Sequence, residues 1–183
     1  GDIGSTMDAY ADAWLTPGSP LEADAITVNP YLGVGALTGA FERAETHGKG
    51  LFVLAVTSNP EASALQTSHG ADGSTVSASV ISEVSDRNAR TAGEGEWGSF
   101  GFVIGATVDW SDAGISPFHP HAPILAPGFG AQGAGPADLR RRFGAMASMV
   151  IASESRSILS AGPDGLVTAI DSRVARYQEE LDA

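Results

Sequence analysis

The chain has 183 residues, within the range of one domain, and 43% of them are hydrophobic, which is enough to bury a core. Its net charge of −12 argues against a nucleic-acid binder, which needs basic surface, and the absence of cysteine excludes disulfides and thiolate metal sites. No apolar run is long enough to cross a bilayer and no signal-peptide pattern opens the chain, so we expect a soluble cytoplasmic protein with no membrane partner.

Helical and strand patterns alternate along the chain, which predicts an α/β fold built from βαβ units. Most of the strand candidates are near-continuous apolar runs, typical of strands covered on both faces in a parallel sheet. In chain order the expected elements are a helix around Met7–Trp14, a strand at Ala25–Val28, a helix around Leu37–Ala44, a strand at Leu51–Thr57, a helix around Val76–Val84 with Ser74 as its N-cap, strands at Gly101–Thr107 and Pro123–Ala126, a helix around Leu139–Met146 with Pro136 at its first position, a strand at Met149–Ala152 and a helix at Leu166–Leu181 behind Asp164.

No linker divides the chain, so we expect residues 1–183 to form a single domain. The longest irregular stretch is VDWSDAGISPFHPHA at 108–122, and long loops in compact domains are often functional. Five parallel strands fit either an open doubly wound sheet or the later part of an eight-stranded barrel, which typically needs ~250 residues. Composition does not decide between these two architectures.

The segment GFGAQG, Gly128–Gly133, matches the dinucleotide-binding pattern G-x-G-x-x-G after a predicted strand. Glu154, at the end of the next strand, lies near the place of a ribose-binding acid. This pattern keeps a dinucleotide-dependent oxidoreductase open as one alternative. Against this alternative, the fingerprint normally lies in the first βα unit of its fold, whereas here several units precede it and only one strand follows.

The same glycine loop and the next strand also suggest a phosphate site. The loop LAPGFGAQGAGP at 125–136 is rich in backbone N–H groups, and Arg156 follows the next strand in SESRSIL. In (β/α)₈ barrels the loops after the last two strands often bind phosphate, and arginine adds a charge-assisted contact. Taken alone, the glycine loop is more simply a flexible turn and Arg156 a solvent-exposed side chain. Taken together, a glycine loop after one strand and an arginine after the next favour phosphate binding.

Two other features of the sequence give little support for a metal site or a serine hydrolase. His119 and His121 flank Pro120 in the long loop with no obvious third ligand, which favours a surface loop over a metal site. No Gly-x-Ser-x-Gly elbow is present, so a serine hydrolase has little support.

Collinear segments of the chain resemble the orotidine 5′-phosphate decarboxylase family, in its longer bacterial type. Gly1 and Asp2 match the last two positions of the family's Asp-x-Lys-x-x-Asp motif, which ends the third barrel strand. DAITVNPYLG resembles the fourth strand, LFVLAVTSNPEA the fifth, GFVIGAT the sixth, APILAPGFGAQG the seventh and VIASESRSIL the eighth. The resemblance implies that the chain is the C-terminal portion, about five βα units, of a (β/α)₈ TIM barrel that lacks its first strands.

The resemblance also implies roles for the substrate-binding residues. Arg156 matches the arginine that binds the 5′-phosphate, and Ser58 matches the hydroxyl that contacts the pyrimidine. Gln132 matches a loop residue that links phosphate and base, while Pro127 and Phe129 match positions packed near the ring. The implied ligands are orotidine 5′-phosphate and uridine 5′-phosphate.

Two further residues imply a homodimer with shared active sites. Asp2 matches a catalytic acid that reaches into the partner's site, and Thr6 matches a ribose contact that crosses with it. The motif lysine, which protonates the ring carbon after carbon dioxide leaves, is not among the 183 residues, and Lys49 lies at the wrong end of the barrel to replace it. The implied activity is therefore that of a carboxy-lyase of pyrimidine biosynthesis, without metal or cofactor, and we expect this chain alone to be inactive.

Two alternatives remain beside the oxidoreductase. Another phosphate-binding TIM-barrel lyase or epimerase would share the two phosphate strands but not Ser58 and Gln132. A non-catalytic phosphate-binding module would share the loops but show no turnover.

Overall fold

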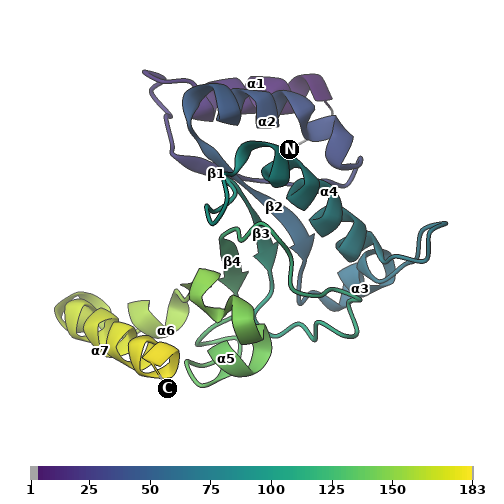
Figure 1. The fold of residues 1–183 in the computed structure, drawn as a ribbon. Helices are drawn as coiled ribbons and strands as arrows, with labels where there is room; N and C mark the ends of the chain where they lie inside the picture. The colour runs from purple at the N-terminus through teal and green to yellow at the C-terminus, as the bar shows by residue number, and fades with distance from the viewer. Residues whose placement is uncertain (1–3, 183) are drawn as a thin grey trace.

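The computed structural model describes residues 4–182, which contain one five-stranded, fully parallel sheet (Figure 1). The strands follow one another across the sheet in sequence order, so each is hydrogen-bonded to its neighbours in the chain. All five predicted strands are confirmed, with small shifts at their ends. They are β1 (Ala25–Val28), β2 (Gly50–Val56), β3 (Phe100–Ile104), β4 (Ile124–Pro127) and β5 (Val150–Ser153).

The helices lie between the strands and beyond them. Helices α1 and α2 run side by side near β1, and α6 and α7 lie at the opposite end of the sheet (Figure 1). None of the helices described in residues 4–182 is long and apolar enough to span a bilayer. Their bounds are α1 (Gly4–Leu15), α2 (Thr38–His47), α3 (Pro60–Gln66), α4 (Val76–Thr91), α5 (Asp138–Phe143), α6 (Arg156–Leu159) and α7 (Gly162–Asp182), with 3₁₀ turns η1 (Val34–Leu37) and η2 (Gly144–Met149).

Burial is uneven across the sheet, which corrects the prediction that the strands are covered on both faces. Every residue of the central strand β3 is buried, but along β2 buried residues alternate with half-buried ones such as Phe52 and Leu54. Thr27 of β1 and Ile151 of β5 are exposed. Successive side chains of a strand point to opposite faces, so this pattern shows that helices cover one face more fully than the other.

Two predicted helix starts are wrong by one or two residues. Helix α4 is capped by Thr75 rather than Ser74, because the Thr75 hydroxyl accepts a hydrogen bond from the Ala78 N–H at 3.0 Å. Pro136 lies in a turn, and α5 begins at Asp138, whose carboxylate accepts from the Gly135 N–H at 2.8 Å.

A buried asparagine fixes the start of the central strand. The Asn88 side-chain amide of α4 donates to the Phe100 carbonyl at 2.8 Å, and its oxygen accepts from the Phe100 N–H at 3.1 Å. Both backbone groups are thereby satisfied without a strand partner. Since all five strands are parallel, their carboxyl ends meet at one edge of the sheet, where the predicted site residues follow β2, β4 and β5.

Candidate functional site

Four of the predicted site residues line one cavity at the carboxyl edge of the sheet. It holds about 220 Å³, and we call it the arginine cavity. The loop after β4 and the loop after β5 form its walls, because these strands pair in register from Ile124 and Val150 to Pro127 and Ser153. It is lined by Pro127, Gly128, Phe129, Ala131, Gln132, Ser153, Ser155 and Arg156.

The glycine loop in this cavity uses several of its own donors. The N–H groups of Gly130, Gly133 and Ala134 are bonded to carbonyls within the loop at 2.7 to 3.2 Å. The Gly135 N–H donates to Asp138. A hydrogen bond from Arg141, together with this one, holds the pKa of Asp138 below its usual value. The loop is therefore a folded turn with fewer free donors than its composition predicts.

Two kinds of donor remain available at the arginine cavity. Arg156 is exposed, and no acidic side chain in residues 4–182 lies within ion-pair distance of it. The N–H groups of Ala131 and Gln132 have no hydrogen-bond partner within the described chain. A guanidinium beside unpaired N–H groups is a chemically sound site for an anion.

Ser58 lies at the same edge but lines a different cavity of about 240 Å³, which we call the serine cavity. Its position follows from the end of β2. Gln66 of α3 accepts from the Thr57 N–H at 3.0 Å, and the Ser77 hydroxyl donates to the Ala55 carbonyl at 3.0 Å. Strand β2 is two strands away from β4, which is about 10 Å at the usual spacing. The two cavities therefore lie at separate points on one edge.

The two residues predicted to act across a dimer are not in either cavity. Thr6 is exposed in the first turn of α1 and lines neither the arginine cavity nor the serine cavity. Asp2 lies outside the described residues. Their roles in a partner's site stay predictions.

The geometry does not suit the dinucleotide alternative. No helix starts at Gly133, and α5 begins only at Asp138. Glu154 is not free to bind a ribose, because its carboxylate accepts hydrogen bonds from Ser157 at 2.6 Å and Tyr177 at 3.0 Å and pairs with Arg173 at 2.8 Å. Sequence reasoning missed Tyr177 and Arg173 because both lie on the far C-terminal helix.

The long loop at 108–122 is anchored by packing and by short polar contacts. Phe118 packs edge-on against Phe102 at 4.6 Å between ring centroids. Asp109 accepts hydrogen bonds from the Ser111 hydroxyl and N–H, which lower its pKa. His119 and His121 are exposed, and residues 4–182 hold no group of three or more potential metal ligands.

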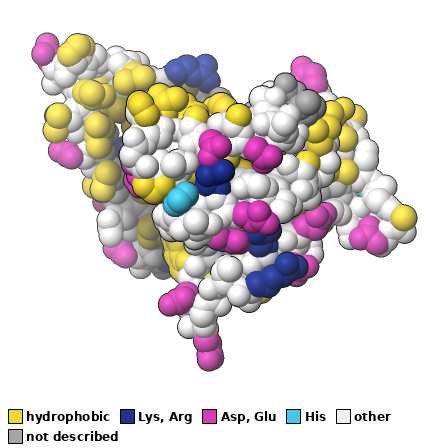
Figure 2. Space-filling model, turned by 90° about the horizontal axis from the view of Figure 1, so that it is seen from above, with side chains coloured by type: hydrophobic (Ala, Val, Ile, Leu, Met, Phe, Trp, Pro, Cys, Tyr) yellow, Lys and Arg dark blue, Asp and Glu magenta, His cyan; other side chains and the backbone are white. Residues whose placement is uncertain are grey.

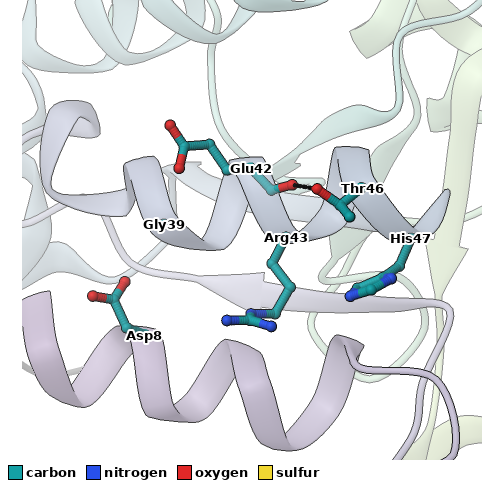
Figure 3. A pocket seen from close by; sticks show the side chains of 6 residues that line it. All are labelled: Asp8, Gly39, Glu42, Arg43, Thr46 and His47. Atoms are coloured by element: carbon teal, nitrogen blue, oxygen red, sulfur yellow. Dashed lines mark hydrogen bonds between the residues drawn. The ribbon is translucent and has the colours of Figure 1, made fainter.

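A larger hollow of about 350 Å³ lies between α1 and α2, away from the strand ends. Asp8 of α1 and Arg43 and His47 of α2 point into the space between the helices (Figure 3). Arg43 is already paired with Asp12 at 2.5 Å, and none of the predicted site residues contributes to this hollow. The ion pair between Arg43 and Asp12 joins the two helices.

The charge of the chain is visible on its surface. Acidic side chains are spread over the face seen in Figure 2, with few basic ones among them. An anionic ligand would therefore meet a repulsive field that local donors must overcome.

Comparisons with known proteins place this geometry in a family. The family model described as orotidine 5′-phosphate decarboxylase / HUMPS family matches residues 1–169. An orotidine 5′-phosphate decarboxylase of Salinispora tropica is 52% identical over 164 residues, which cover 90% of this chain and 57% of the relative. That of Streptomyces coelicolor is 48% identical over 184 residues, covering 99% of this chain and 63% of the relative.

Solved structures agree in fold. The crystal structure of a Streptomyces avermitilis protein named for orotidine 5′-phosphate decarboxylase has a TM-score of 0.91 and 47% identity, covering all of this chain and 63% of that one. The UMP synthase of Leishmania donovani has a TM-score of 0.70 and 27% identity, covering 98% of this chain and 38% of that one.

The Salinispora and Streptomyces proteins thus extend beyond this chain, which spans about three-fifths of their length, and it spans 38% of the Leishmania protein. The five parallel strands with their helices are accordingly part of a TIM barrel, as the family resemblance implies. The chain belongs to the orotidine 5′-phosphate decarboxylase / HUMPS family.

Proposed function

We propose that this chain is the C-terminal part of an enzyme that decarboxylates orotidine 5′-phosphate to uridine 5′-phosphate in pyrimidine nucleotide biosynthesis. One observation carries the proposal. The loops after β4 and β5 bring Gln132 and Arg156 into one cavity, and Arg156 has no ion-pair partner in residues 4–182, in a chain whose family match covers residues 1–169. Residues 1–183 would form one domain with the remaining strands of the barrel, in the cytoplasm.

The two cavities suggest how a nucleotide would lie. Arg156 would bind the 5′-phosphate in the arginine cavity, and Ser58 would contact the pyrimidine in the serine cavity. Gln132 would connect the two ends, while Pro127 and Phe129 would pack near the ring. The separation of β2 from β4 suits a ligand that bridges two sites on one sheet edge.

The net charge of −12 gives the phosphate contacts a particular importance. A nucleotide monophosphate is an anion, so Arg156 and the N–H groups of Ala131 and Gln132 must offset the repulsion of the acidic surface. Contacts remote from the reacting bond can supply binding energy that is used for orientation at the reacting centre. The phosphate contacts would thus contribute to catalysis as well as to affinity.

The chemistry follows from the family resemblance. The bond between the substrate's carboxylate and its ring carbon breaks, carbon dioxide leaves, and the electron pair remains on the ring carbon. The motif lysine, which is not among these residues, donates the proton that this carbon takes up. An ammonium group stabilises the developing carbanion electrostatically. No metal or cofactor enters this sequence of steps.

The shared site of a homodimer can be tested with residues of this chain. If Asp2 acts in the partner's site while Arg156 acts in its own, Asp2→Asn and Arg156→Ala subunits complement each other. One site of the heterodimer then carries both defects and the other carries neither. Random mixing gives about half heterodimers and hence roughly a quarter of the wild-type sites. Activity equal to the sum of the two variants, with heterodimers verified, would contradict sharing.

The activity itself is tested with a chain extended to the full length of the relatives. Turnover of orotidine 5′-phosphate to uridine 5′-phosphate in the presence of a chelator is the expected result. Turnover of a sugar phosphate instead would favour another lyase or epimerase of this barrel group. Tighter binding of a nicotinamide dinucleotide than of uridine 5′-phosphate would favour the oxidoreductase. Phosphate binding without any turnover would favour a binding module.

A further inference from the structure

A nearly buried carboxylate lies in the chain between Ser153 and Ser155, two residues that line the arginine cavity. The side chain of Glu154 follows β5 and is only 2% exposed. It accepts a hydrogen bond from Ser157 in its own loop, while Tyr177 and Arg173 reach it from α7. A carboxylate removed from water is costly unless it is paired and hydrogen-bonded, so these contacts keep it in place.

Tyr177 contacts both loops that form the arginine cavity. Its hydroxyl donates to Glu154 at 3.0 Å, in the loop after β5. Its ring packs edge-on against Phe129, in the loop after β4, with 5.6 Å between centroids. Burial, together with the bond to Glu154, raises the pKa of Tyr177 above its usual range, so the hydroxyl keeps its proton as a donor. One side chain of α7 therefore bridges the two walls.

The two loops also touch directly. Gly130 has a left-handed φ of 72°, and a Cβ on it would lie 2.6 Å from Glu154 Oε1 and closer still to the Ser157 hydroxyl. The position of Glu154 and Ser157 thus sets how near the glycine loop can come. Arg156 lies two residues after Glu154 and Gln132 two residues after Gly130, so the cavity's main polar groups flank this contact.

We propose that Glu154 and Tyr177 are positioning residues, through which α7 holds the glycine loop and the Arg156 loop at the spacing that a phosphate group requires. This inference rests on the proposed function of the arginine cavity. It assigns α7 a role in ligand binding although none of its residues lines that cavity. Loss of the bridge changes the spacing of the donors rather than the donors themselves.

Tyr177→Phe in the full-length protein tests this, because it removes one hydroxyl and keeps the ring on Phe129. We expect binding of uridine 5′-phosphate to weaken about three- to tenfold, the range of one lost hydrogen bond, with uridine binding unchanged. Glu154→Gln should act in the same direction and more strongly. Thr46→Val on α2 is the control, since it also removes one hydroxyl, which donates to the Glu42 carbonyl at 2.7 Å, and Thr46 lines neither the arginine cavity nor the serine cavity; the change should alter neither affinity.

The ratio of the affinity for uridine 5′-phosphate to the affinity for uridine distinguishes a positioning role from a general effect on stability. General loosening of the fold lowers both affinities and the unfolding midpoint, but it leaves the ratio unchanged. An unchanged ratio in both Tyr177→Phe and Glu154→Gln, with Arg156→Ala lowering it, would overturn the positioning role and leave the proposed function intact. An unchanged ratio in Arg156→Ala as well would overturn the phosphate site and this inference with it.

Discussion

Replacement of Arg156 by alanine is the most direct probe of the arginine cavity. The guanidinium is exposed and lines the cavity, and no carboxylate in residues 4–182 lies within ion-pair distance of it. Its removal therefore breaks no internal ion pair, and the fold should be unaffected. The change in ligand affinity then reports the contact with the ligand.

The expected magnitude follows from the type of contact. A hydrogen bond to a charged group contributes about 1.5–3 kcal/mol. At about 1.4 kcal/mol for each tenfold change, the dissociation constant for uridine 5′-phosphate should rise about 10- to 150-fold. Uridine lacks the phosphate, so its dissociation constant should stay within about twofold. Isothermal titration of the full-length protein with both ligands at one ionic strength measures the difference.

Arg90→Ala provides a control with the same loss of charge. Arg90 is exposed on α4, lines a different hollow, and has no ion-pair partner in the described part of the chain. Exposed charges are largely screened beyond about 8 Å at physiological ionic strength, so its removal should leave both affinities unchanged. Equal losses for uridine 5′-phosphate and uridine in Arg156→Ala, or the same effect in Arg90→Ala, would refute the phosphate assignment.

Three further predictions concern the fold. In the full-length protein, Asn88→Ala should lower the free energy of unfolding by about 2–4 kcal/mol in urea titrations, because it leaves the N–H and C=O of Phe100 buried without partners. Ser85→Ala should be near neutral, because the Ser85 hydroxyl has no hydrogen-bond partner to lose in the described residues. The pKa of Asp138 is lowered by folding, so its contribution to stability is complete above its usual pKa of 3.8 and is lost as pH falls through the folded-state pKa. In the full-length protein, the stability difference between wild type and Asp138→Asn should therefore shrink from pH 7 to strongly acidic pH. Residues 1–183 alone should show no cooperative thermal transition, because apolar side chains at one end of the sheet, such as Leu159 (65%) and Val167 (69%), are exposed, and a sharp calorimetric peak would contradict this.

The strands could be predicted because each is a short apolar run between turn signals, and all five are confirmed. Helix α3 was missed because none of its residues is buried, so it has no apolar stripe to detect. Pro60 at its start was the available signal, since proline favours the first turn of a helix. Coverage of both sheet faces was predicted from near-continuous apolar runs, which do not reveal which face the described helices cover.

The candidate site divides in the same way. That Gln132 and Arg156 lie close together could be predicted, because they follow adjacent parallel strands whose carboxyl ends meet. The contact of Tyr177 with Glu154 could not be predicted, because it joins residues 23 apart and depends on how α7 packs against the loop after β5. In the sequence, Tyr177 is one member of an apolar helical stripe, and only its contacts in the folded structure distinguish it from the other members.

The glycine pattern shows why a motif alone left two chemistries open. In a dinucleotide fold the glycines of G-x-G-x-x-G allow a tight turn and bring the pyrophosphate to a helix that starts at once. In this chain Gly130 is required for a different reason, since a side chain there would collide with Glu154 and Ser157 of the neighbouring loop. The same glycine pattern therefore reflects the close approach of two loops in this chain and the start of a helix in a dinucleotide fold. The residue at which the next helix begins, Asp138 rather than one beside Gly133, distinguishes them.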